Sequence, residues 1–140
     1  MRTATASDIP AIVRLTRELH AVTDMRIPLD DGMVAAFAGS LINRDDALAL
    51  VVGEPVAGML CASIERTPLS PVRLAVEHGW YCSRDARGAG RGLLDAYIAW
   101  AREQGAWGVR LSTPAAAPMS ANALARRGFR AAETAWIMEL

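Results

Sequence analysis

The segment Arg87-Gly88-Ala89-Gly90-Arg91-Gly92 constrains the fold most strongly, because three glycines alternate there between an expected strand and an expected helix. Glycines at alternate positions remove Cβ atoms, so that a ligand can approach the bare main chain. The segment leads into a helix predicted over 93–104, and the unpaired N–H groups and dipole of a helix N-terminus favour an anion. Arg84 adds further positive charge nearby. The sequence therefore predicts a turn that binds a diphosphate.

Two better-known phosphate-binding motifs do not fit this segment. A P-loop ends in Gly-Lys-Ser or Gly-Lys-Thr, and the chain contains no lysine. A dinucleotide-binding G-x-G-x-x-G motif would need a third glycine where the chain has Leu93 or Asp95. A tight strand-to-helix turn without a ligand is the alternative interpretation. The position between a strand and a helix favours the phosphate-binding one.

The hydrophobic pattern on either side of the turn predicts an α+β fold. Apolar residues recur at helical spacing over 9–19, 33–41 and 93–101, whereas 47–52, 56–64 and 72–82 are apolar or alternating runs. Arg2 to Ala4 predicts an opening strand. We expect a further strand over 107–112, a short helix over 119–127, and an extended end over 129–140 that could form a hairpin. The expected order is β-α-α-β-β-β-α-β-α-β, with a central mixed sheet flanked by helices.

Length and charge narrow the classes of function. The 140 residues fit one domain over 1–140, with room for a core and one cleft. The 15 basic and 15 acidic side chains cancel, which disfavours a general nucleic-acid binder. Residues 1–80 carry seven arginines against ten acidic side chains, and residues 81–140 carry eight against five. An anionic ligand is therefore expected in the second half of the chain.

The chain lacks both a long apolar run and a set of suitably spaced metal ligands. No apolar run approaches the ~20 residues that cross a bilayer, and no signal peptide is recognisable, so we expect a soluble cytoplasmic protein with no membrane partner. Cys61 and Cys82 are too few and too isolated for a zinc site or a disulfide framework. His20 and His78 lack metal-ligand spacing. We expect two reduced thiols on strands and no metal.

In this setting the glycine segment resembles the R/Q-x-x-G-x-G/A acetyl-CoA signature of the GNAT superfamily of N-acetyltransferases. The strand that ends Trp80-Tyr81-Cys82 is similar to the strand before that signature, and the step of five residues from Cys82 to Arg87 is the usual one. The sequence Ala-Leu-Ala-Arg-Arg-Gly-Phe over 123–129 resembles the late helix of the family and its Gly-Phe landmark. The resemblance covers nearly the whole chain.

The resemblance implies a GNAT-like fold and transfer of an acetyl group from acetyl-CoA to a primary amine by direct attack. In such a site the pyrophosphate is held by the main-chain amides of Arg87, Gly88, Ala89, Gly90, Arg91 and Gly92. The pantetheine arm pairs with the edge of the 72–82 strand around Tyr81 and Cys82, where an N–H near Cys82 polarises the thioester carbonyl. The acceptor is then a small-molecule or peptide amine, and a homodimer is compatible with this reading.

A base must remove a proton from the acceptor, because an alkyl amine has a pKa of about 10. Glu77 is the first choice, acting directly or through water, since it lies on the strand that leads to the site. His78 is the second choice, and it lies on the other face of that strand unless a bulge intervenes. An ordinary surface position is the alternative interpretation for both residues.

The chain departs from the family at the general acid. The late helix often carries a tyrosine that protonates the leaving thiolate, and the matching position here is Leu124. Ser120 or water could take this role, and a thiol with a pKa of about 8.5 can also leave as the thiolate. The departure supports an alternative function, a non-catalytic module that binds or senses acetyl-CoA or another acyl-CoA.

The acceptor is expected between residues 20–30, the strand that carries Glu77, and the loop over 113–118. Asp24, Asp30 and Asp31 could attract a cationic amine, although helix capping explains Asp30 and Asp31 equally well.

Asn122 is expected on a helix surface. The four tryptophans are expected mainly in the core, and they are Trp80, Trp100, Trp107 and Trp136.

Overall fold

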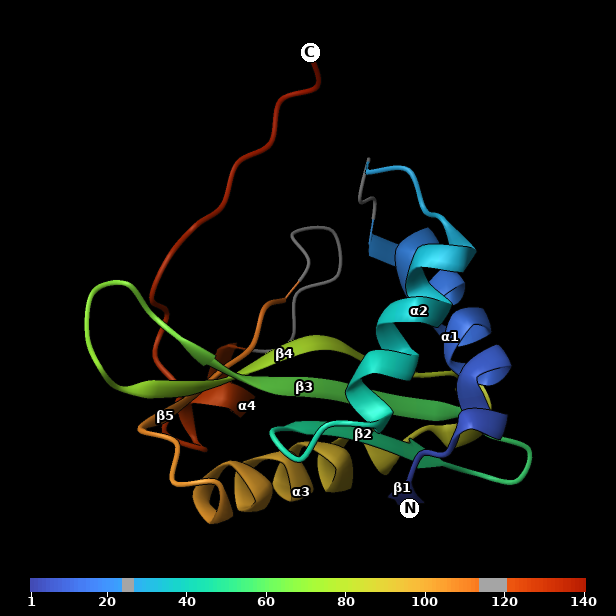
Figure 1. Cartoon of the computed structure of the whole chain (residues 1–140), viewed down its shortest axis with the longest axis horizontal. Coiled ribbons are helices and arrows are strands. Elements are labelled where there is room, and N and C mark those ends of the chain that lie inside the picture. The colour runs from blue at the N-terminus through green and yellow to red at the C-terminus, as the bar shows by residue number, and fades with distance from the viewer. Residues whose placement is uncertain (24–26, 114–120) are drawn as a thin grey trace.

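The computed structural model describes residues 1–23, 27–113 and 121–140 and shows the α+β fold that the sequence predicts (Figure 1). A short 3-10 helix precedes α1 at Ala6–Asp8, and another precedes α3 at Arg84–Ala86. The strands and helices follow in the order β1 (Arg2–Thr3), α1 (Ile9–Thr23), α2 (Asp31–Ile42), β2 (Ala47–Val52), β3 (Gly58–Arg66), β4 (Arg73–Cys82), α3 (Ala89–Glu103), β5 (Gly108–Arg110) and α4 (Ala121–Ala125). None of the helices in these ranges has the length and apolar content to span a bilayer.

The five strands form one mixed sheet in the order β1-β2-β3-β4-β5. All neighbours are antiparallel except β4 and β5, which are parallel. Helices α1 and α2 cover one face, and α3 covers the other (Figure 1). The parallel pair is joined through α3, as a parallel connection requires. The glycine segment therefore lies where the chain leaves the end of β4 and crosses the sheet.

Two hydrophobic clusters hold the layers together, one on each face of β3. Met59 and Cys61 point into the cluster with α1 and α2, whereas Leu60 and Ala62 point into the cluster with α3. This alternation is the period of two expected for a strand, and burial on both faces explains why residues 58–64 are apolar except for Ser63. β3 is thus the central strand of the core.

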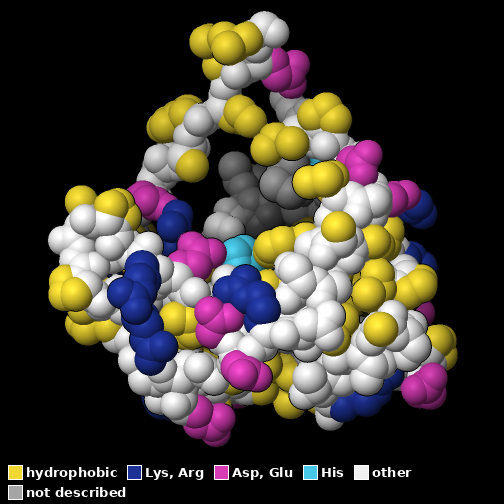
Figure 2. All heavy atoms as spheres, in the orientation of Figure 1, with side chains coloured by type: hydrophobic (Ala, Val, Ile, Leu, Met, Phe, Trp, Pro, Cys, Tyr) yellow, Lys and Arg dark blue, Asp and Glu magenta, His cyan; other side chains and the backbone are white. Residues whose placement is uncertain are grey.

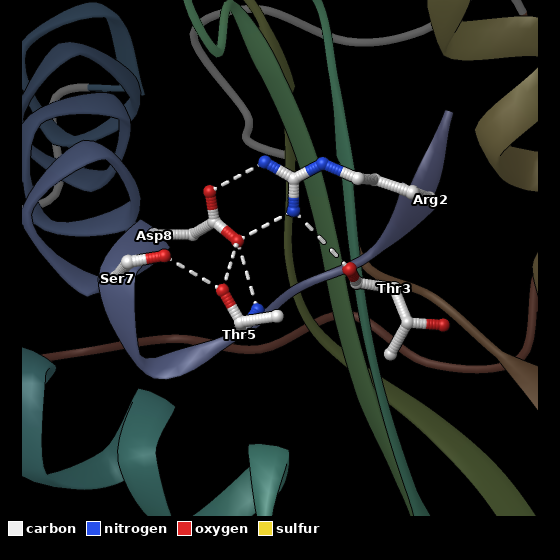
Figure 3. Close-up of polar contacts among 5 residues, drawn as sticks. All are labelled: Arg2, Thr3, Thr5, Ser7 and Asp8. Atoms are coloured by element: carbon white, nitrogen blue, oxygen red, sulfur yellow. Dashed lines mark hydrogen bonds and ion pairs between the residues drawn. The ribbon is translucent and has the colours of Figure 1, made fainter.

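An ion pair at the N-terminus fixes β1 to the start of α1 (Figure 3). Both terminal guanidinium nitrogens of Arg2 donate to the carboxylate of Asp8, at 2.6 and 2.8 Å, and the main-chain N–H of Thr5 donates to the same carboxylate at 2.8 Å. The side chain of Asp8 is only 7% exposed. The bond from Arg2 holds the pKa of the Asp8 carboxyl well below its ordinary value.

The structure corrects two predictions, one on the C-terminal segment and one on the tryptophans. Residues 129–140 form no strand and no hairpin, and they run away from the sheet (Figure 1). Alternating residues satisfy the strand pattern there, but β5 has only three residues and offers a short edge for pairing. Trp107 and Trp136 are 76% and 93% exposed, so they are not core residues, whereas Trp80 and Trp100 pack against the cluster with α3.

Candidate functional site

The glycine segment forms the N-terminal turn of α3, which begins at Ala89 rather than at Leu93 as the sequence pattern predicts. Gly88 is the N-cap, and its φ of +98° lies in the left-handed region that favours glycine. No side chain caps this turn, so the first N–H groups of α3 have no side-chain acceptor. The positive end of the helix dipole is therefore available to an anion.

The three glycines have different surroundings. A Cβ added at Gly88 or Gly92 would meet no atom of the described protein within 4 Å. A Cβ at Gly90 would contact Trp80 Nε1 at 3.5 Å and Cys82 Sγ at 3.7 Å. Gly88 and Gly92 therefore provide the bare surface that the sequence predicts. Gly90 instead allows the helix to pack closely against β4.

Three exposed arginines surround this turn. Arg84 lies in the preceding 3-10 helix, Arg87 is its C-cap, and Arg91 lies in the first turn of α3. None of the three side chains bonds to another described residue. Asp85 is the one acidic residue between 83 and 92. The arrangement gives an electropositive, side-chain-poor surface that suits a phosphate group.

β4 and β5 separate beside this surface. Their pairing covers only Leu74 to Val76 of β4, against Gly108 to Arg110 of β5. From Glu77 to Cys82, β4 therefore has an edge without a strand partner among the described residues on the β5 side. An extended ligand can pair with that main-chain edge, as an added strand would. The open edge leads directly to the glycine turn.

A β-bulge interrupts β4 at His78. In the register with β3, Ala62 pairs with Glu77 and Cys61 pairs with Gly79, so His78 has no partner. The residue as a whole is exposed, although its side chain is only 21% exposed. Much of the exposed surface of His78 is therefore main chain. The bulge makes a peptide group accessible at the point where β4 and β5 diverge.

Glu77 lies at the apex of this divergence. Its Oε2 accepts a hydrogen bond from the main-chain N–H of Ser112 at 3.2 Å, across from β4 to the chain after β5. Burial raises the pKa of the Glu77 carboxyl above its ordinary value, and the bond from Ser112 opposes this shift. A carboxylate with a raised pKa is a stronger base than an exposed one, which suits proton abstraction.

His78 points to the face covered by α2. Its Nε2 lies 2.7 Å from Ser63 Oγ and 3.4 Å from a carboxylate oxygen of Glu65, and its ring packs edge-on against Phe37 at 5.1 Å between centroids. Burial lowers the pKa of His78 and Glu65 raises it. Glu77 and His78 therefore point to different surroundings even with the bulge.

Tyr81 and Cys82 take opposite faces at the end of β4. Tyr81 packs against the cluster with α1 and α2, and Cys82 packs against the cluster with α3. Both cysteines are free thiols, and burial raises the pKa of Cys82 and raises that of Cys61 to about 12. The thiols are therefore protonated at neutral pH. What the open edge offers a ligand at Tyr81 and Cys82 is the main chain.

Several other predicted residues lie outside the site or outside the described residues. Leu124 packs with Phe129 against the cluster with α3, and Asn122 is exposed. Asp30 caps α2 by accepting from Met33 N at 2.8 Å, and Asp31 forms an ion pair with Arg17. Asp24, Ser120 and most of the predicted acceptor loop over 113–118 lie outside the described residues.

Sequence reasoning missed a cavity of about 340 Å³ between α1, α2, β3 and β4. Hydrophobic side chains gather over α1 and α2 on the face drawn in Figure 2. The cavity is lined mainly by apolar side chains, with His78 and Gly79 of the bulge in its wall. The sequence feature that points to this cavity is the apolar stripe of α2, since Met33, Val34 and Phe37 all contribute to the lining.

These features agree with a sequence profile of the acetyltransferase (GNAT) family, which matches residues 12–129. The chain belongs to this family, whose members transfer acetyl groups from acetyl-CoA, and the resemblance seen in the sequence is confirmed. The sequence of no curated protein matches this chain significantly.

Solved structures share the fold over almost the whole chain. One is a Clostridium acetobutylicum protein described as a predicted acetyltransferase and solved with acetyl-CoA, with a TM-score of 0.79, 15% identity, and coverage of 99% of this chain and 94% of that chain. A Bacillus halodurans protein described as a transcriptional regulator has a TM-score of 0.74, 23% identity, and coverage of 99% and 97%. A Trypanosoma brucei acetyltransferase has a TM-score of 0.68, 21% identity, and coverage of 99% and 97%.

Proposed function

We propose that this protein is an N-acetyltransferase that transfers the acetyl group of acetyl-CoA to a primary amine of a small molecule or peptide. The observation that supports this most is the open edge of β4 over Glu77 to Cys82, which leads to the uncapped first turn of α3. An elongated ligand with a diphosphate at one end fits this arrangement, because the turn suits the anion and the edge suits an amide-containing arm.

Each part of the site has a role in this proposal. The N–H groups of the first turn of α3 bind the pyrophosphate, and Arg84, Arg87 and Arg91 balance its charge. The β4 edge from Gly79 to Cys82 pairs with the pantetheine arm. This places the thioester near the bulge, where a main-chain N–H is suited to polarise the carbonyl oxygen.

The chemical step is a direct attack within a ternary complex. The unprotonated amine nitrogen forms a bond to the thioester carbonyl carbon, the C–S bond breaks, and the electron pair leaves on the thiolate of CoA. Glu77 accepts the proton lost by the amine, directly or through a water molecule. Its raised pKa makes it a stronger base than an exposed carboxylate.

The leaving thiolate does not depend on a tyrosine in this proposal. Leu124 is apolar, and the hydroxyl of the buried Tyr97 is already bonded to the carbonyl oxygen of Arg110 at 2.9 Å. A thiol with a pKa of about 8.5 leaves as the thiolate at a disadvantage of about 2 kcal/mol at pH 7. Solvent then protonates it.

Thiol release from acetyl-CoA in the presence of a panel of amines tests the proposal. We expect release above the rate of hydrolysis with at least one class of primary amine, and a product acetylated on nitrogen by mass spectrometry. Tight binding of acetyl-CoA in calorimetry without release for any amine would contradict the enzyme and favour the sensing module. Leu124 is the observation that supports this second candidate, since it supplies no acid for the leaving group.

A further inference from the structure

We propose that the cavity between α1, α2, β3 and β4 binds the apolar body of the acceptor, so that the acceptor is an amine carried on an aryl or branched alkyl group. This inference rests on the proposed function and narrows it. Polyamines, amino sugars and lysine side chains in basic peptides are then poor acceptors. The inference follows from the lining, the rim and the position of the cavity.

The lining is apolar and the volume suits a small molecule. The cavity measures about 340 Å³, near the lower end of the range for small-ligand pockets. Its walls include Ile12 from α1, Val34 and Ala38 from α2, and Met59 from β3. Each apolar ligand atom buried there gains transfer free energy, so an aryl or branched alkyl group is bound better than a polar chain.

The rim carries two large apolar side chains that remain exposed. Met33 is 71% exposed and Phe37 is 45% exposed, and both line the cavity. Exposed apolar side chains around a cavity mark a place where a partner covers them. An apolar ligand entering between them would remove their surface from water.

The polar groups of the lining are few and already bonded. Thr16 Oγ1 donates to the Ile12 carbonyl at 2.8 Å, and the ring of His78 contacts Ser63 and Glu65. No carboxylate belongs to the lining formed by the described residues. A second ammonium group would therefore be buried without a counter-charge, which is unfavourable.

The nearby acidic residues are also engaged elsewhere. Asp30 caps α2 through the N–H of Met33, and Asp31 is paired with Arg17 on α1. Glu65 lies 3.4 Å from the ring of His78. Among the described residues, these contacts leave the cavity without the acidic wall that a polyamine or a lysine-rich peptide would need.

The position of the cavity joins the apolar body to the reaction. His78 and Gly79 are the bulge residues of β4, and they form part of the cavity wall. Glu77 precedes them directly on the strand and points into the gap between β4 and β5. An amine whose body fills the cavity thus has its nitrogen at the bulge of β4. Glu77 pairs with Ala62 and so lies on the α3 face of the strand, which implies that the proton reaches Glu77 through a water molecule.

A panel of primary amines tests this inference. Phenethylamine and 3-methylbutylamine represent the apolar class, and putrescine, glucosamine and Nα-acetyl-lysine amide represent the others. We expect kcat/KM to be at least about tenfold higher for the apolar class, because one aromatic or branched group is buried. The measurement is thiol release at saturating acetyl-CoA.

Two variants at the rim link the preference to the cavity. Phe37→Ala is expected to raise KM for phenethylamine about tenfold with little change in kcat, because it removes apolar contact area. Met33→Asp is expected to raise KM for phenethylamine and to lower it for putrescine. Leu69→Ala is the matched control, since Leu69 is 92% exposed and lies in the loop between β3 and β4. Circular dichroism checks that each variant is folded. We expect all three to fold, because the substituted side chains are exposed.

Two results would overturn the inference in distinguishable ways. Faster turnover of putrescine, glucosamine or the lysine amide, with Phe37→Ala kinetically equal to wild type, would exclude the apolar acceptor while leaving the N-acetyltransferase in place. Absence of release with every amine, together with binding of acetyl-CoA, would exclude both the acceptor and the proposed function.

Discussion

The carboxylate of Glu77 accepts a hydrogen bond from the main-chain N–H of Ser112 at 3.2 Å, across the gap where β4 and β5 stop pairing. This contact places a partly buried carboxylate at the point where the open edge of β4 begins. It also connects β4 to the chain after β5, beside the open edge of β4 that the proposed function assigns to the pantetheine arm. The proposed contacts with acetyl-CoA are made by main-chain groups and arginine side chains, so a change of the Glu77 side chain tests its role as a base apart from cofactor binding.

Glu77→Gln is expected to lower kcat by roughly 10²-fold or more with little change in acetyl-CoA affinity, because the amide cannot accept the proton. In the wild type, kcat/KM should rise with pH through the pKa of Glu77, which burial places above its ordinary value. The variant should lose that rise. Rates measured from pH 4 to 9 check this, and an unchanged pH profile would exclude Glu77 as the base.

His78→Gln provides the contrasting variant. Burial lowers the pKa of His78, so the ring is neutral at pH 7, and glutamine can retain a hydrogen bond to Ser63. We expect the acidic limb of the pH profile to persist and kcat to stay within about tenfold of wild type. Loss of that limb in His78→Gln, with its retention in Glu77→Gln, would assign the base to His78 instead.

Asp8→Asn tests the ion pair that ties β1 to α1. The pKa of Asp8 is lowered in the folded protein, so its stabilising contribution is fully present above the pKa of the unfolded chain, about 4, and is lost as the pH falls through the native pKa. We expect the variant to have a Tm a few degrees lower at pH 7, with the difference shrinking in acid. Thermal unfolding followed at pH 7 and at pH 3 gives the comparison, and an equal gap at both pH values would contradict this role.

Local signals in the sequence predicted the parts of the fold that depend on neighbouring residues. The glycine turn and the amphipathic face of α3 are such features, because Gly88 must adopt a positive φ and Leu93, Leu94 and Tyr97 must face the sheet. The order from β1 to α4 followed from the changes of period along the chain.

Features that depend on contacts between distant segments were left open or missed. The bulge at His78 exists only relative to the register of β3, and the cavity requires α2 to pack over β3 and β4. The alternation at residues 134–140 predicted a strand, but a pattern does not reveal whether a free edge is long enough to pair. The different roles of Gly90, which packs against β4, and Gly92, which faces open space, depend on the helix beginning at Ala89.

The most direct test of the binding site is the affinity of Gly92→Val for acetyl-CoA, measured by titration calorimetry. A side chain at Gly92 meets no protein atom within 4 Å, and valine has a higher helix propensity than glycine, so the variant should fold. Ala99→Val, two turns further along α3 at an exposed position, is the control. The account predicts that acetyl-CoA binds at least about tenfold more weakly to Gly92→Val, because the added methyl groups fill the space beside the phosphate-binding N–H groups, while Ala99→Val binds normally. Wild-type affinity in Gly92→Val would contradict it.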